Sequence, residues 1–80
     1  MSSLSRLRWR CRRGMKELDL IFERFLENGF NNLTENQKMD FERLLECQDD
    51  QLYDWFYQGQ EPEDRALVAI VALIRDDLGH

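Results

Sequence analysis

The residue types that usually perform catalysis are sparse in this 80-residue sequence and poorly spaced for it. There are two cysteines, Cys11 and Cys47, and one histidine, His80. Nucleophilic catalysis needs a nucleophile, a base and an orienting group within hydrogen-bond reach, which this set does not supply. A zinc site needs about four ligands, and the cysteines form no C-x-x-C pair. We therefore expect no catalytic centre, no metal site, and two free thiols in a reducing compartment.

Adjacent carboxylates are the other candidates for acid–base chemistry, and they occur at Asp49/Asp50, Glu63/Asp64 and Asp76/Asp77. Each pair falls at the end or on the polar face of an expected helix, where carboxylates usually cap the backbone or are solvated. The sequence contains neither a P-loop nor a G-x-G-x-x-G motif. We therefore interpret the pairs as caps, predict no stably bound cofactor, and expect an accessory protein rather than an enzyme.

The most informative stretch runs from residue 12 to residue 19 and forms a helix–glycine–helix corner. Arg13 and Glu17 lie four residues apart on opposite sides of Gly14. Both side chains can project from one outer surface with bare backbone between them, and a partner backbone can approach closely over a glycine. The alternative is a local ion pair and a turn, which at the surface contributes under about 1 kcal/mol. The residues alone leave both interpretations open.

Charge is distributed unevenly along the chain. Five arginines precede Gly14 without any acid, all 16 acidic residues follow it, and the formal net charge is -5. The basic segment either folds back onto the acidic body or meets an acidic partner. Nucleic acid is not expected as a partner, because the acidic body would repel phosphates.

The basic segment also resembles a mitochondrial presequence in composition. It is short and runs directly into the Gly14 corner, so we expect a cytoplasmic location rather than the mitochondrial matrix. The longest apolar run, residues 66–74, has nine residues. A bilayer span needs about 20, so no direct membrane insertion is expected.

Helical spacing of apolar residues recurs throughout, and no segment alternates as a half-buried strand does. The pattern predicts a basic first helix over about 4–13, a second over about 15–28, a third from Thr34 to near Cys47, a fourth capped by Asp49 or Asp50, and a fifth starting at Pro62. The predicted fold is therefore all-α: a compact five-helix bundle in one domain, residues 1–80, with its core at about 15–78.

Several side chains are expected to define these helices. Thr34 and Gln37 fit a capping box, and Gly14, Gly29 and Gly59 can each close a helix. The first helix should turn Leu4, Leu7 and Cys11 inward, and the fifth should turn in Leu67, Ile70, Val71, Ile74 and Leu78. Small apolar residues widen the fifth stripe almost all round, which predicts a central helix.

The fourth helix is dense in aromatic residues. Trp55 and Phe56 share a face with Leu52 and are expected in the core, whereas Tyr53 and Tyr57 share another face at i, i+4. The tyrosines are either half-buried or exposed, and exposed tyrosines would suit an interface.

At two places the sequence resembles the succinate dehydrogenase flavinylation factors, the SdhE family. The family hallmark R-G-x-x-E, usually within R-R-G-M-x-E-L-D, is matched throughout residues 12–19. A second segment, L-L-E-x-x-D-x-x-L-Y-x-W, is matched by Leu44, Leu45, Glu46, Asp49, Leu52, Tyr53 and Trp55. The Pro62-x-Asp64 start of the last helix also fits, so the resemblance extends from about residue 7 to residue 74.

The resemblance implies a five-helix assembly factor. Such factors bind the flavoprotein subunit of succinate dehydrogenase, and in some bacteria that of fumarate reductase. They promote covalent attachment of FAD to a histidine of that subunit, while the linkage chemistry belongs to the partner and its flavin. By position, Arg13, Gly14 and Glu17 carry over as the partner-binding surface. Many members have a longer polar tail than this chain, and any role of that tail is not carried over.

Our hypothesis is an assembly factor, expected to be monomeric, that stabilises one conformation of its partner. Arg13 would pair with a partner carboxylate or carbonyl, Glu17 with a partner donor, and Gly14 would let the surfaces close. Further candidate contacts are Trp9, Arg12, Met15, Asp19 and Tyr53. Two alternatives are an antitoxin-like regulator of a membrane protein and a small FAD carrier, for which no polar pocket is evident.

Overall fold

The helices follow one another with short connections, as the apolar spacing predicts. The computed structural model describes the backbone of residues 3–78 and the side chains of residues 6–77. Within these limits the elements are α1 (Ser3–Arg10), α2 (Lys16–Asn28), a 3-10 turn η1 (Phe30–Asn32), α3 (Glu35–Leu45), α4 (Asp49–Tyr57) and α5 (Arg65–Leu78). The all-α five-helix prediction is confirmed. The predictions for the side chains of Leu4, Leu78 and His80 lie outside the described residues.

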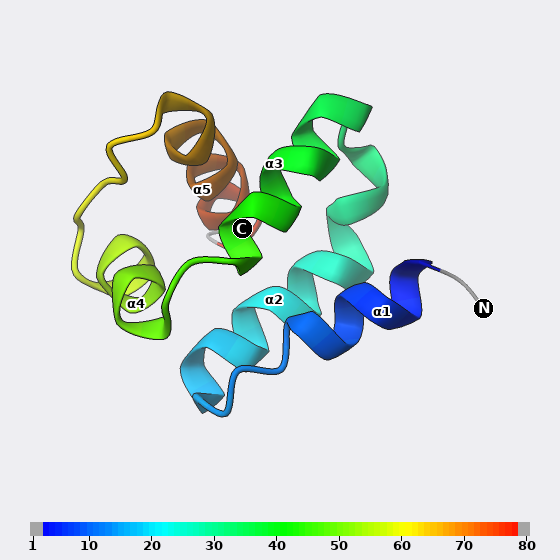
Figure 1. Cartoon of the computed structure of the whole chain (residues 1–80), viewed down its shortest axis with the longest axis horizontal. Coiled ribbons are helices and arrows are strands. Elements are labelled where there is room, and N and C mark those ends of the chain that lie inside the picture. The colour runs from blue at the N-terminus through cyan, green and yellow to red at the C-terminus, as the bar shows by residue number, and fades with distance from the viewer. Residues whose placement is uncertain (1–2, 79–80) are drawn as a thin grey trace.

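The core is built from one face of each helix. α5 packs against α2, α3 and α4, while Figure 1 shows α4 and α5 on one side of the molecule and α1 on the other. Phe22 and Phe41 are completely buried at the centre, with ring centroids 6.0 Å apart in an edge-to-face arrangement. The predicted stripes of α2 and α5 are buried as expected, from Leu18 to Leu26 and from Leu67 to Ile74.

The expected all-round burial of α5 is not observed. Ala69 and Ala72 are exposed, and Leu73 is 38% exposed. The helix packs with one face only, because three neighbouring helices are too few to enclose it on every side. No described helix is long and apolar enough to cross a membrane.

Three helix ends differ from the sequence-based boundaries. α1 ends at Arg10 rather than near Arg13, since the Arg12 N–H turns back to the Trp9 carbonyl and the chain leaves the helix. α4 is preceded by Gln48, whose N–H donates to Gln51 Oε1, so neither Asp49 nor Asp50 is its cap.

α5 begins at Arg65, three residues later than predicted. Asp64 starts this helix, because its Oδ1 accepts from the Ala66 N–H at 2.9 Å, while Pro62 lies buried before it. The capping box of α3 is confirmed: Thr34 Oγ1 accepts from the Gln37 N–H, and Gln37 Oε1 accepts from the Thr34 N–H.

Candidate protein-interaction site

The corner between α1 and α2 is a turn whose backbone requires glycine. Gly14 has φ +83°, in the left-handed region that side-chain-bearing residues rarely adopt. A Cβ placed at Gly14 would meet no atom within 4 Å, so the outer side of the turn is open. Met15 then enters α2 in an extended conformation, and its carbonyl accepts from the Leu18 and Asp19 N–H groups. The turn therefore presents bare backbone at the surface, as the sequence predicts.

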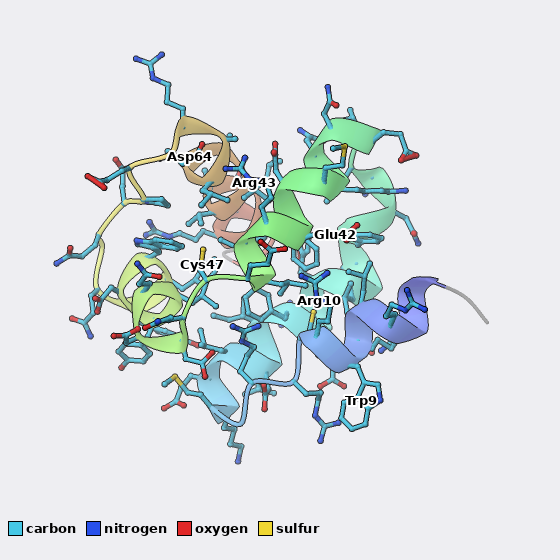
Figure 2. The ribbon with its side chains drawn as sticks, in the orientation of Figure 1. Trp9, Arg10, Glu42, Arg43, Cys47 and Asp64 are labelled. Carbon is cyan, nitrogen blue, oxygen red and sulfur yellow. The ribbon has the colours of Figure 1, made fainter. Side chains whose placement is uncertain are left out.

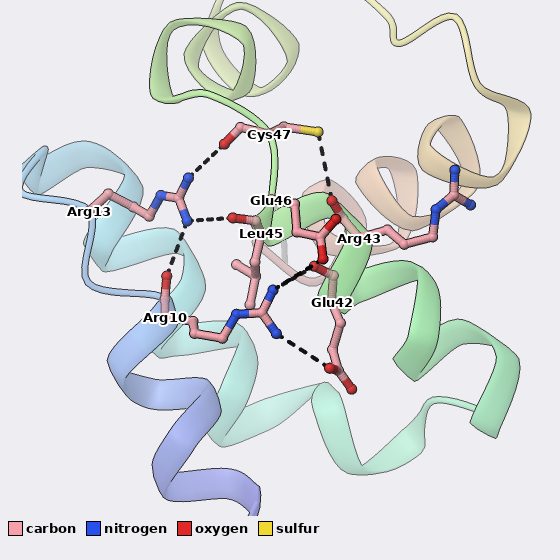
Figure 3. A network of polar contacts seen from close by, with 7 residues as sticks. All are labelled: Arg10, Arg13, Glu42, Arg43, Leu45, Glu46 and Cys47. Carbon is pink, nitrogen blue, oxygen red and sulfur yellow. Dashed lines mark hydrogen bonds and ion pairs between the residues drawn. The ribbon is translucent and has the colours of Figure 1, made fainter.

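Arg13 does not project from that surface. Its side chain is only 14% exposed, and its guanidinium reaches from the turn to the corner between α3 and α4. Nε donates to Asp49 Oδ1 at 2.8 Å. Nη1 and Nη2 donate to the carbonyls of Leu45 at 2.7 Å and Cys47 at 2.6 Å (Figure 3). Nη1 also donates to the Arg10 carbonyl at 3.1 Å, so four of the five guanidinium donors are used inside the chain.

The expectation that Arg13 and Glu17 share an outer surface is therefore wrong for Arg13. Glu17 is exposed, and no ion pair joins it to Arg13 among the described side chains. The acids that hold Arg13 come from elsewhere. Asp49 accepts a hydrogen bond from the Arg13 guanidinium, and Asp19 Oδ1 accepts from the Arg13 backbone N–H at 2.6 Å. Asp19, which the sequence suggested as a possible partner contact, thus stabilises the turn by a hydrogen bond from α2.

The basic segment divides into inward-facing and outward-facing arginines. Arg10 folds back to Glu42, with Nη1 to Oε1 at 3.3 Å, and lies 3.9 Å from Glu46 (Figure 3). Folding back onto the acidic body is thereby confirmed for Arg10 and Arg13. The exposed arginines Arg6, Arg8 and Arg12 form no ion pair with a described acid.

Trp9 stands on the outward face of α1. It is 77% exposed, and Figure 2 shows it pointing away from the body of the molecule. A groove of about 400 Å³ runs beside it between α1 and α2, lined by Arg8, Trp9, Cys11, Arg12, Asp19, Glu23 and Leu26. Met15 is half-buried against the core. Trp9 and Arg12 line this groove, and the exposed Gly14 turn follows Arg12 directly in the chain; we call these exposed residues together the corner surface.

The two tyrosines of α4 lie beside this corner. Their ring centroids are 5.0 Å apart, which confirms that they share a face. Tyr53 is half-buried and Tyr57 is 47% exposed, while Phe56 is in the core and Trp55 packs partly against it. Tyr57 Oη donates to the Glu17 carbonyl at 3.1 Å. Burial and the nearby Glu17 charge raise the pKa of Tyr57 above its ordinary value.

Both cysteines lie near enough to Arg13 for its charge to oppose the effect of burial, which raises the pKa of each thiol. Cys11 is buried, and burial raises the pKa of its thiol to about 11 against the opposing charges of Arg13 and Arg10. Cys47 is half-buried, and its Sγ lies 3.8 Å from the Arg43 carbonyl. Within residues 6–77 no group of three potential metal ligands comes together.

Comparison with known proteins places these features in a family. The model of the family described as "Flavinator of succinate dehydrogenase" matches residues 5–78. The chain belongs to this family. It is 49% identical over 72 residues to the FAD assembly factor SdhE of Legionella pneumophila (strain Lens), covering 90% of each chain. It is 40% identical over 75 residues to the FAD assembly factor SdhE of Shewanella oneidensis, covering 94% of this chain and 92% of that protein.

In this chain the two sequence segments that carry the family resemblance meet in space. Arg13 belongs to the first segment and Asp49 to the second, 36 residues later, and they form an ion pair at 2.8 Å. Neither Asp49 nor Tyr57 was predicted as a residue of the corner. A signal for Asp49 was present, since it belongs to the second segment, but its position at the start of a helix led to its interpretation as a cap. Nothing in the sequence indicated that Tyr57 would reach the Glu17 carbonyl.

Proposed function

We propose that this chain is an assembly factor that binds the flavoprotein subunit of succinate dehydrogenase and promotes covalent attachment of FAD. The family match over residues 5–78 and the names of the relatives support this function. The linkage chemistry belongs to the flavoprotein subunit and its flavin, and this chain acts by contact. FAD reaches it only as the partner's cofactor, and the fumarate reductase flavoprotein is a second client. The relatives are bacterial, and we place this encounter in the cytoplasm, with the factor as a monomer.

The observation that carries the proposal is the open left-handed turn at Gly14. A partner backbone can lie directly on it, because no side chain stands in the way. Glu17 offers an exposed carboxylate to a partner donor one helical turn further on. Trp9 and Arg12 extend the corner surface, where an amphipathic ring and a guanidinium suit a protein interface. Tyr53 and Met15 are only half-buried, so part of each side chain remains accessible to a partner.

Covalent flavin on the flavoprotein subunit tests the function directly. It is measured by in-gel fluorescence in cells that lack their own factor and carry this chain, a variant, or nothing. We expect the native chain to restore fluorescence and Gly14→Arg to lose it. The matched control is Gly59→Arg, because Gly59 also has a positive φ of 75° and open space around it but lies after α4. This control should retain fluorescence.

The opposite results are equally informative. If the native chain is folded and abundant yet restores nothing, the flavinylation proposal fails for that subunit, and the regulator of a membrane protein takes its place. If the purified chain is yellow with bound flavin, it is a carrier instead. If Gly59→Arg loses fluorescence as Gly14→Arg does, the loss reflects backbone strain, and the corner surface loses its support as the contact.

A further inference from the structure

The guanidinium of Arg13 completes the ends of two helices at once. The carbonyls of Leu45 and Cys47 lie at the end of α3, where helix carbonyls lack intrahelical donors and a positive charge is favourable. Asp49 is the first residue of α4, where a negative charge is favourable. Arg13 donates to all three groups from the turn between α1 and α2. One side chain thereby ties the Gly14 turn to the α3–α4 corner.

Two further contacts hold the same turn. Asp19 Oδ1 accepts from the Arg13 N–H at 2.6 Å, and Tyr57 Oη donates to the Glu17 carbonyl at 3.1 Å. The first contact comes from α2 and the second from α4. The backbone from Arg13 to Glu17 is therefore fixed at both ends by side chains, while its outer side at Gly14 remains open.

The Arg13 contacts differ in kind from the neighbouring Arg10 pair. The side chains of Arg13 and Asp49 are 14% and 38% exposed, whereas those of Arg10 and Glu42 are 34% and 52% exposed. Partly buried, charge-assisted hydrogen bonds are stronger than exposed ion pairs. A planar guanidinium fork can serve several acceptors in fixed directions, which the single ammonium of lysine cannot. The geometry of the turn thus depends on arginine at residue 13.

We propose that Arg13 and Asp49 are positioning residues for the corner surface. The guanidinium holds the Gly14–Glu17 backbone in the conformation that the partner binds, and it does not itself contact the partner. A surface that is already ordered loses less conformational entropy on binding, so it binds more tightly with the same contacts. This inference rests on the proposed function, because the ordered surface is the one that would meet the flavoprotein subunit.

The test compares Asp49→Lys with Asp50→Lys in the flavin-attachment assay. Both variants make the same charge change in the first turn of α4, but Asp50 forms no contact with Arg13. In Asp49→Lys, repulsion between the introduced ammonium and Arg13 should displace the guanidinium. We expect flavin attachment and affinity for the subunit to fall about tenfold, the effect of about 1.4 kcal/mol of lost ordering. Asp50→Lys should remain near the native level.

Conservative variants separate positioning from folding. Asp49→Asn keeps an oxygen acceptor for Nε and should retain most of the activity. Arg13→Lys keeps the charge without the fork and should lose activity, while circular dichroism shows that the helices remain. Hydrogen exchange of the Arg13, Leu18 and Asp19 amides, which donate to Asp19 Oδ1 and to the Met15 carbonyl, supplies a readout on the purified chain. It should accelerate in Asp49→Lys and Arg13→Lys but not in Asp50→Lys.

Three results decide the proposal. If Asp49→Lys matches Asp50→Lys in both exchange and flavin attachment, the positioning role is overturned. If Arg13→Lys loses attachment with unchanged exchange, Arg13 contacts the partner directly and the proposal is again overturned. If the native chain does not promote flavin attachment to the subunit, the proposed function fails. Hydrogen exchange alone then decides whether Arg13 and Asp49 hold the turn.

Discussion

At the scale of single residues, Gly14 combines two properties that one substitution can separate. Its φ of +83° needs a residue that tolerates the left-handed region, and the space outside it is open. Asparagine tolerates that conformation better than other side chains do. We expect Gly14→Asn to fold with a loss of stability under about 1 kcal/mol. It should nevertheless promote less flavin attachment to the subunit, because the asparagine side chain keeps the partner backbone at a distance.

Thermal unfolding and in-gel flavin fluorescence measure the two effects separately. Gly59→Asn is the control, since it makes the same change at another positive φ outside the corner surface. Full flavin attachment by Gly14→Asn would mean that the glycine serves the backbone conformation alone.

The buried thiol of Cys11 makes stability depend on alkaline pH. Burial raises its pKa from the ordinary 9.0 to about 11 in the folded chain. Between these pH values the unfolded chain has released a proton that the folded chain still holds, so stability falls as pH rises from about 9 to about 11. Denaturant unfolding at several pH values should show this slope, and Cys11→Ala should show a shallower one. Equal slopes would exclude Cys11 as the source.

Arg13 shows where sequence reasoning reaches its limit at this scale. The sequence identified the residue, the glycine beside it and the surface that the glycine leaves bare. It did not reveal the direction of the guanidinium, because three of its acceptors are the backbone carbonyls of Arg10, Leu45 and Cys47, which carry no side-chain signature. The fourth, Asp49, lies 36 residues away, and only the packing of α1 and α2 against the α3–α4 corner brings it near.

At the scale of elements, the start of α3 is fixed by local chemistry. Thr34 Oγ1 accepts from the Gln37 N–H at 3.1 Å, and Gln37 Oε1 accepts from the Thr34 N–H at 2.8 Å. We expect Thr34→Ala to cost about 1 kcal/mol, which for a domain of this size lowers the unfolding midpoint by roughly 4–8 °C. Calorimetry should show this shift, whereas Asn36→Ala, on the exposed side of the same turn, should leave the midpoint nearly unchanged.

The end of α2 depends on close packing at Gly29. The sequence predicts that Gly29 closes this helix, and Gly29 is its C-cap, but its φ is -112°, so any residue could adopt the backbone. The glycine is needed because a Cβ would lie 2.6 Å from Phe25 Cε1. Phe25 is 2% exposed and packs on Phe41 with ring centroids 5.5 Å apart, so it has little room to move.

We therefore expect Gly29→Ala to destabilise the fold by about 1–3 kcal/mol, the usual cost of overpacking a core. Denaturant unfolding measures this loss. A second substitution, Phe25→Leu, removes the ring that the new methyl meets, so adding Gly29→Ala to it should cost less than in the native chain. Simple additivity of the two losses would place the effect of Gly29 elsewhere.

Helix number and helix faces could be predicted from the sequence because periodicity encodes them directly. The helix boundaries depend on which polar group accepts from each free backbone N–H, and in several places more than one nearby residue could do so. Asp64 was recognised only as part of an acidic pair. The start of the last helix was predicted at Pro62 instead, because proline is a favourable first helical residue. Asp64 also pairs with Arg43 of α3, a contact across 21 residues that local patterns do not contain.

At the scale of the whole molecule, the basic segment serves two purposes through one short helix. Its inward residues fasten α1: Leu7 and Cys11 are buried, and Arg10 and Arg13 reach the acids of α3 and α4. Its outward residues leave positive charge beside Trp9 on a molecule whose net charge is -5. The electrostatic field at the corner surface is therefore positive, whereas the net charge of the whole molecule is negative. An acidic segment of the partner fits this field better than a basic one does.

This arrangement predicts salt-sensitive binding that depends on Arg6, Arg8 and Arg12. Exposed charges steer association when the Debye length is long, and their effect fades as salt screens them. The affinity for the flavoprotein subunit should fall as ionic strength rises, mainly through a slower association rate. Replacing the three arginines by glutamine should slow association about tenfold at low salt and flatten its salt dependence.

The control makes the same total charge change away from the corner surface, with glutamine at the exposed arginines Arg24, Arg65 and Arg75. Kinetic binding assays at several salt concentrations then compare the two triple variants. Because both have the same net charge, a difference between them isolates the position of the charge from its amount. Equal association rates would mean that only net charge matters and that the basic segment works solely as a fastening for α1. A slower rate for the first variant alone would assign the outward arginines to partner capture.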